Sequence, residues 1–277
     1  MQIVLLFVLV VRKTQCIQLN RREFVSSIPS TLVSSTVLKE SILSKRFAQN
    51  ESQLRRPEFG LFASDIYYPR WFQGEWAACS RAISVKAPCG LDLFGGENVM
   101  SSAQKELEQA VNYDVRFIKT NDDAVIADRP YNTKNLVSAT LGDKGSLSGL
   151  PSSSSFDPND LRFTLDIGNT VFEARLRIIA RLYDQINDTQ FQTSEFIRQS
   201  VSISNNLLAP PSIKDIETLC KYTLNSDGTI SCDQRTATWL FPSDQTASIK
   251  EATAQGRAID VRTYTVSYIS ATSSDLL

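Results

Sequence analysis

The side chains that most often perform acid–base or nucleophilic chemistry are unevenly represented in this 277-residue chain, which contains no histidine. Its absence removes the usual general base, the Ser-His-Asp and Cys-His nucleophile pairs, and every zinc site that needs an imidazole ligand. We therefore expect a protein that is not an enzyme and that holds no cofactor or metal. The alternative is an enzyme that uses Asp or Glu for acid–base chemistry.

One polar cluster stands out, in which Asp128 and Arg129 are followed by Asn132. Asp128 and Arg129 can pair with each other, and Asn132 is a suitable N-cap for a short helix over residues 133–141 that ends at Gly142. We prefer this structural interpretation. The alternative is that the three polar side chains face a ligand.

Four cysteines outside the N-terminal region form two candidate disulfide pairs, Cys220 with Cys232 and Cys79 with Cys89. The first pair flanks a turn at residues 225–228, so a hairpin would bring the two Cα atoms within the roughly 7 Å that a disulfide requires. A bridge needs an odd-length loop centred on Ser226, or a bulge. Nothing fixes the path between Cys79 and Cys89, and four buried free thiols fit the sequence equally well.

Residues 67–76 form an aromatic segment, Tyr-Tyr-Pro-Arg-Trp-Phe-Gln-Gly-Glu-Trp. The Gly74-x-Trp76 step resembles the start of lipocalin-like barrels, in which a glycine lets the chain pass close to the barrel floor and the tryptophan fills it. We expect Trp76 to be buried near the closed end. Arg262 of the last strand is its candidate stacking partner.

Alternation of apolar and polar residues predicts a mainly β protein. The expected strands are residues 74–86, 111–119, 124–128, 161–166, 171–183, 191–204, 213–224, 229–241 and 258–270. Short helices are expected at 101–110, 133–141 and 248–256, and residues 142–160 are expected to form a flexible loop. About eight or nine strands with two or three short helices predict an antiparallel lipocalin-like barrel or a strongly curved sheet.

Residues 1–58 have the composition of a targeting leader, and residues 59–277 of a single domain. Residues 3–11 are a short apolar run typical of a signal peptide, and Arg21-Arg22 precede a Ser/Thr-rich, acid-poor stretch typical of transit and twin-arginine signals. We expect this leader to contribute nothing to the core, with the final cleavage between residues 48 and 59. It predicts a plastid protein of the thylakoid lumen.

Charge divides the chain in the same place. Residues 1–58 hold nine Lys/Arg and four Asp/Glu, whereas the remaining residues hold 20 and 26. An acidic body argues against a nucleic-acid partner. No later segment approaches the roughly 20 apolar residues of a membrane span, so we expect no transmembrane segment in the mature chain.

The aromatic segment also carries a family resemblance. Tyr68, Trp71, Gly74 and Trp76, in a Tyr-Pro-x-Trp-Phe-x-Gly-x-Trp pattern, together with the cluster from Asp128 to Asn132, resemble an uncharacterised family of cyanobacterial and plastid proteins. The resemblance covers about residues 66–269 and implies a photosynthetic compartment. We expect a lipocalin-like protein that binds an apolar molecule such as a lipid or pigment, or that assists a photosystem subunit.

Overall fold

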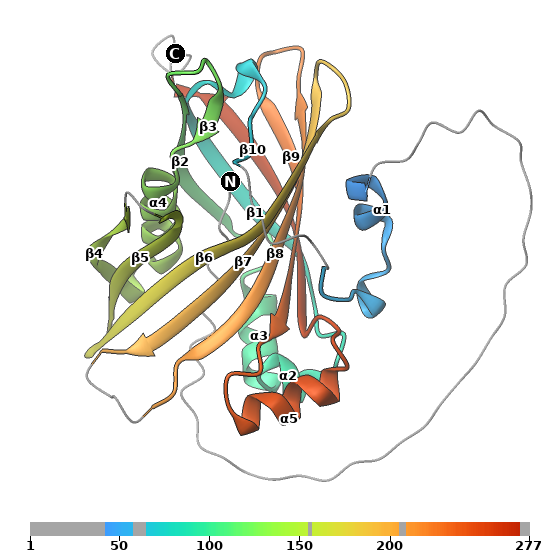
Figure 1. Ribbon diagram of the computed structural model, residues 1–277, viewed down its shortest axis with the longest axis vertical. Helices are drawn as coiled ribbons and strands as arrows, with labels where there is room; N and C mark the ends of the chain where they lie inside the picture. Colours follow the sequence, from blue (N-terminus) through green and yellow to red (C-terminus); the bar gives the residue numbers. More distant parts are fainter. Residues whose placement is uncertain (1–41, 58–64, 155–156, 205–208, 272–277) are drawn as a thin grey trace, which may run out of the picture.

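A computed structural model describes residues 42–57, 65–154, 157–204 and 209–271. In these residues ten antiparallel strands form one strongly curled sheet, a half-barrel, in the order β3-β2-β1-β10-β9-β8-β7-β6-β5-β4 (Figure 1). The strands are β1 (Gly74–Lys86), β2 (Ala110–Lys119), β3 (Val125–Ala127), β4 (Gly145–Ser154), β5 (Asp157–Ile167), β6 (Thr170–Gln185), β7 (Gln190–Ile203), β8 (Ser212–Leu224), β9 (Ile230–Leu240) and β10 (Asp260–Ser270). The prediction of a strongly curved antiparallel sheet is confirmed.

Five short α-helices accompany the sheet in the described part of the chain: α1 (Ile42–Ala48), α2 (Leu91–Phe94), α3 (Glu97–Lys105), α4 (Arg129–Leu141) and α5 (Gln245–Ala254). Figure 1 shows α2, α3 and α5 together at the lower end of the half-barrel. No helix among the described residues is both long and apolar enough to cross a bilayer.

The first strand in sequence, β1, pairs with β10, the strand with the highest residue numbers in the described sheet. This pairing places Trp76 opposite Ser270. The beginning and the end of the sheet's sequence therefore lie side by side. Gly74 begins β1 with φ of 119°, a backbone conformation that L side chains rarely adopt. The sheet does not close completely, since β3 and β4 are its edges.

Helix α4 occupies the gap between the two edges and packs on both β2 and β4. Its first turn is fixed by Asp128, whose side chain accepts a hydrogen bond from the backbone N–H of Tyr131, and by a proline within that turn. The helix therefore starts four residues earlier than the predicted one. The buried side of α4, with Leu136, Val137 and Leu141, completes the wall that the sheet leaves open.

The upper part of the half-barrel is filled with aromatic side chains. Tyr68 lies at the centre, with ring centroids of Phe72, Phe117 and Phe191 within 4.8–5.5 Å of its own. Trp76 is 6% exposed and donates a hydrogen bond from Nε1 to the carbonyl of Phe72 at 2.8 Å. Its predicted burial is confirmed, and packed aromatic rings occupy this end of the interior.

Residues 42–57 pack on the outer face of β7, β8 and β9. Arg46 and Glu217 form a buried ion pair at 2.7 Å, and Arg56 pairs with Asp215. Leu54 is 1% exposed and belongs to a second apolar cluster with Trp239. The expectation that residues 1–58 add nothing to the core is therefore wrong for residues 42–57. Residues 1–41, which carry the signals expected of the leader, lie outside the described residues.

The expected flexible loop at 142–160 is also wrong in its described part. Residues 145–154 and 157–167 form β4 and β5, which pair in antiparallel register with three irregularities. Serine and glycine are common here because β4 is an edge strand with little to bury. The sequence signal for a solvated loop and for a polar edge strand is the same.

Candidate ligand-binding cavity

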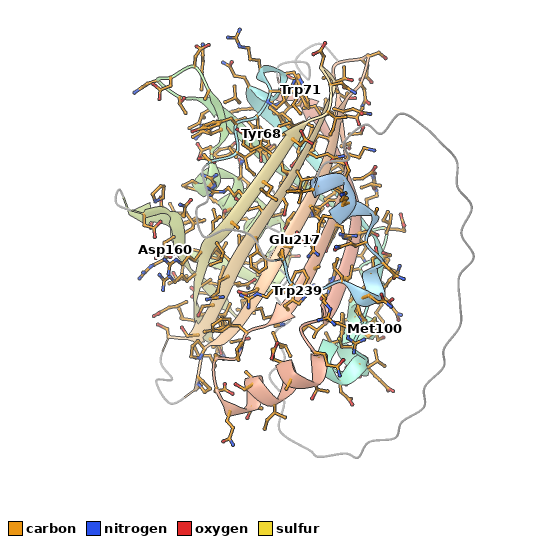
Figure 2. All side chains as sticks on the ribbon, turned by 45° about the vertical axis from the view of Figure 1, so that its right-hand side comes forward. Tyr68, Trp71, Met100, Asp160, Glu217 and Trp239 are labelled. Carbon is orange, nitrogen blue, oxygen red and sulfur yellow. The ribbon has the colours of Figure 1, made fainter. Side chains whose placement is uncertain are left out.

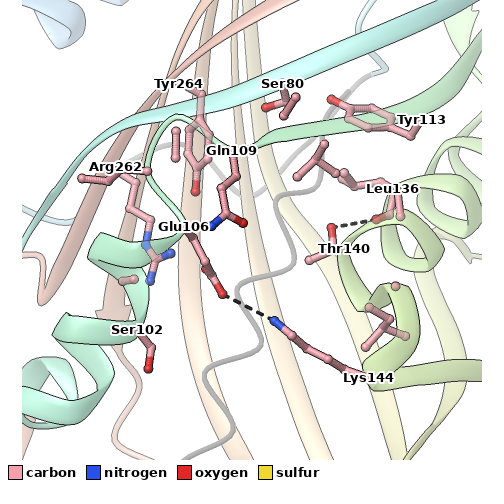
Figure 3. Close-up of a pocket in the computed structure, with 18 of the residues that line it drawn as sticks. Ser80, Ser102, Glu106, Gln109, Tyr113, Leu136, Thr140, Lys144, Arg262 and Tyr264 are labelled. Atoms are coloured by element: carbon pink, nitrogen blue, oxygen red, sulfur yellow. Dashed lines mark hydrogen bonds and ion pairs between the residues drawn. The ribbon is translucent and has the colours of Figure 1, made fainter.

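The lower part of the half-barrel is hollow. A cavity of about 610 Å³ lies between β1, β2, β10, α3 and the end of α4 (Figure 3). Apolar side chains form much of its wall: Ala82, Val85, Val99, Ala103, Leu107, Val111, Leu136, Ala139, Leu141 and Ile167. Cavities of about 300–1,000 Å³ with such walls are typical of small-molecule sites.

The mouth of the cavity is bridged by one ion pair. Glu106, at the end of α3, lies 3.7 Å from Nζ of Lys144, which follows α4 (Figure 3). Both side chains are more than half exposed, at 54% and 77%. Solvent screens such a pair, so its contribution to stability is small, but it ties together the two segments that flank the opening.

Arg262 is the most deeply buried charge that lines the cavity, with 6% of its surface exposed. Its Nε and Nη2 donate to the carboxylate of Asp260 at 3.2–3.3 Å. Burial alone would lower the pKa of Arg262, but Asp260, Tyr264 and Glu106 together outweigh it and the pKa is raised. Burial raises the pKa of Asp260, and it also raises the pKa of Tyr264 to about 12.

Arg262 does not stack on Trp76. Trp76 lies opposite Ser270, eight residues beyond Arg262 on β10, which is about 26 Å along a strand. The guanidinium lies instead over the ring of Phe94, 5.9 Å from its centroid. The specific lipocalin analogy, an arginine over the floor tryptophan, is therefore wrong, because Arg262 and Trp76 mark opposite ends of the interior.

A buried group of four charges lies in the upper interior. Arg129 donates to Asp65 at 3.0 Å, and Arg181 pairs with Glu195 at 2.8 Å; Arg129 also approaches Glu195 at 3.9 Å. Burial would raise the pKa of Asp65, but Arg129 and Arg181 hold that pKa below its ordinary value. Arg129 and Arg181 thus favour the ionised form of Asp65.

The polar cluster of residues 128–132 is arranged differently from the prediction. Asp128 pairs with Arg116 at 2.6 Å and not with Arg129. Asn132 lies inside α4 and is not its cap; its amide accepts from the N–H of Arg116 and donates to the carbonyl of the same residue. Asp128 and Asn132 therefore attach α4 to β2, while Arg129 belongs to the buried charges.

The aromatic motif is structural over most of its length (Figure 2). Tyr68 is 5% exposed in the core, and Gly74 starts β1. Trp71 is half-buried, stacks on Phe72 with centroids 4.2 Å apart, and donates from Nε1 to the carbonyl of Asp188 at 3.1 Å. None of these residues lines the cavity.

All four described cysteines have free thiols. The hairpin loop is centred on Asp227, not Ser226, so Cys232 lies opposite Tyr222 and Cys220 is only its diagonal neighbour. Such neighbours are about 7–8 Å apart, at the limit for a disulfide. Both side chains are buried, so these thiols pack as part of the core.

Cys79 and Cys89 cannot pair in this fold. Cys79 lies seven residues before the end of β1, about 23 Å along the strand, and the three residues from Lys86 to Cys89 are too few to return. Cys89 instead donates from its thiol to the carbonyl of Ala258 at 3.3 Å.

Comparison with known proteins assigns the chain to a family. Residues 60–270 match the model of a domain of unknown function, DUF6816. The chain belongs to this family. No curated protein and no solved structure matches the chain. The assignment agrees with the predicted resemblance to an uncharacterised family and adds no activity to it.

Sequence reasoning placed Arg262 among the site residues but missed its neighbours in the cavity. Glu106 was expected in a helix and Lys144 in a flexible loop.

Arg181, one of the charges in the upper interior, was also missed. A bulge between Ile178 and Ala180 reverses the alternation of β6 and turns the side chain of Arg181 inward. No pattern in a single sequence reveals such a bulge. The two-residue spacing of Arg262 and Tyr264, by contrast, could have indicated that both side chains lie on the inner face of β10.

Proposed function

We propose that this protein binds an apolar small molecule in the cavity of its half-barrel. The observation that supports this best is a space of about 610 Å³ whose lining surface is more apolar than polar, in an interior whose other end is packed with aromatic rings. An empty apolar cavity loses packing contacts, so filling it would stabilise the fold. A purely structural interior would be filled throughout.

The binding proposal is tested with N-phenyl-1-naphthylamine, an uncharged fluorophore that brightens in apolar surroundings. We expect saturable binding to the full chain and loss of that binding in Ala139→Phe, which places a ring in the cavity. Ser138→Phe is the matched control, because it adds the same ring to the exposed side of the same helix. Equal binding by both variants would reject this cavity as the site.

The enzyme alternative has less support. Acid–base catalysis by carboxyl groups needs at least one whose pKa is raised toward neutrality. Asp65 and Glu195 lie close together in the interior, but each is paired with an arginine and the pKa of Asp65 is lowered. Asp260 has a raised pKa but is not among the residues that line the cavity, and the carboxylates that do line it, Glu106 and Asp143, are exposed at its mouth. Binding without turnover is therefore the better proposal.

We also propose that the protein acts in a plastid, in the thylakoid lumen, with a lipid or pigment as the class of ligand or a photosystem subunit as partner. This rests on the composition of the N-terminal residues and is tested by the mature N-terminus. Because Arg46 and Leu54 are buried, we expect the final cleavage before residue 42 and not between residues 48 and 59. Mass spectrometry of the mature protein, together with extraction of co-purifying molecules, decides both points.

A further inference from the structure

The cavity contains one charged side chain that its apolar walls do not explain. Arg262 is buried, lines the cavity, and its guanidinium lies toward the mouth, near Glu106 and Gln109 (Figure 3). The hydrogen bonds to Asp260 use Nε and Nη2, which leaves Nη1 outside that contact. Burying an arginine beside a mostly aliphatic space is costly unless its charge is used.

The buried Arg262 and Asp260 and the half-buried Lys214 do not balance in charge. Asp260 is the carboxylate in contact with Arg262, and Lys214 lies on the same face of the sheet, close enough to interact with both. Burial lowers the pKa of Lys214, and no ion pair within 4 Å is formed by it among the described residues. Two cations thus share one carboxylate.

Other acids near the cavity do not cancel this excess. Glu106 lies at the mouth, faces Lys144 and is 54% exposed. Asp143 also lines the mouth and is exposed. Solvent weakens the effect of both on a buried guanidinium, because water has a much higher effective dielectric constant than the interior.

We propose that the natural ligand is an apolar molecule with a single carboxylate, which Arg262 binds while the apolar part fills the cavity. This rests on the proposed binding function and specifies its ligand class. A carboxylate matches the guanidinium in shape and supplies the one negative charge that Asp260 leaves unbalanced. A phosphate dianion would bring an excess of negative charge into the same site.

The test compares dodecanoate with dodecan-1-ol, which differ in the charged group, as competitors of N-phenyl-1-naphthylamine on the full chain. We expect dodecanoate to displace the fluorophore at a concentration at least about tenfold lower than that needed for dodecan-1-ol. A difference of this size corresponds to a hydrogen bond to a charged group. Arg262→Gln should lose the preference for the acid, so that dodecanoate and dodecan-1-ol displace the fluorophore at similar concentrations. Equal displacement by acid and alcohol in the unchanged protein overturns the proposal and leaves the binding function intact.

Asp260→Asn removes the carboxylate that competes with the ligand for Arg262. It tests the proposal even if Arg262→Gln fails to fold. Removing the competing carboxylate should strengthen the preference for dodecanoate, whereas a merely structural role of the pair would weaken binding of acid and alcohol alike. An unchanged preference in Asp260→Asn counts against the proposal. If neither the fluorophore nor dodecanoate binds, in fluorescence or in calorimetry, the binding function and its ligand class are both wrong.

Discussion

Charged residues of this protein are buried on both faces of the sheet, and several of them form ion pairs. Glu195 contacts Arg181 and Arg129 inside the half-barrel, and Glu217 contacts Arg46 on the outside. Removing one partner from such a group leaves an uncompensated buried charge, which costs much more than an exposed ion pair contributes. Substitution of one of these carboxylates should therefore lower the free energy of unfolding measurably.

Glu195→Gln should lower the free energy of unfolding by about 3 kcal/mol, because Arg181 and Arg129 would lose their shared carboxylate in a buried place. Urea denaturation measures the change. Glu97→Gln, on the exposed side of α3, is the control and should change stability by less than about 0.5 kcal/mol. A loss no larger than the control's would mean that water reaches the pair.

Asp65 predicts an acid dependence of stability. Its pKa is lowered in the folded state, so its contribution is present above the unfolded pKa of about 4 and is lost as pH falls through the lower folded value. In Asp65→Asn the loss of stability below about pH 4 should be shallower than in the unchanged protein. Asp260, whose pKa is raised, is present in both proteins and cancels in the comparison. Parallel acid curves for the two proteins would contradict the prediction.

The cysteines should divide into two classes by reactivity. Cys79 and Cys89 are half-buried, whereas Cys220 and Cys232 are buried and burial raises the pKa of Cys232 well above its usual range. A thiol-labelling reagent should modify the first two in the native protein and the others only after unfolding. Peptide mapping identifies the sites, and fast native labelling of Cys232 would show that the interior opens.

Elements with strong alternation were predicted well from the sequence. The strand at residues 74–86 has the observed bounds of β1, and β6 is a strand although its residues also favour helix, because its alternation continues over six positions. The cavity could not be predicted in the same way. Its lining comes from β1, α3, α4 and β10, and only the curl of the sheet brings these elements together.

The segment from Ile42 to Pro57 is the element whose role the sequence concealed. Its basic residues suggested a leader, but Arg46 and Arg56 neutralise Glu217 and Asp215 on the outer face. A chain that starts at residue 58 should be about 3 kcal/mol less stable than one that starts at residue 42, because the buried Glu217 loses Arg46, whereas Asp215 keeps Arg198. Thermal denaturation of both chains measures this. Equal melting temperatures would restore the leader interpretation of the whole segment.

The molecule as a whole depends on the pairing of β1 with β10, which can be tested through a native cysteine. Cys79 lies opposite Ser267, and directly opposed residues have Cα atoms about 4.5–5.5 Å apart, within the range of a disulfide. Ser267→Cys should form a bridge to Cys79 on mild oxidation, seen by non-reducing peptide mapping. Thr265→Cys, two residues away, is the control, and bridging there instead would indicate a different register.

The position of β10 also sets the order in which the chain can fold. β1 to β3 and β4 to β9 are two blocks of neighbouring strands, and β10 pairs with one block through β1 and with the other through β9. The strand that unites them is synthesised about 190 residues after its partner β1. Such long-range pairing makes folding slow, and both blocks keep an unpaired edge until β10 has been synthesised. A nascent chain of this protein therefore exposes two strand edges, which are prone to aggregation, until β10 emerges from the ribosome.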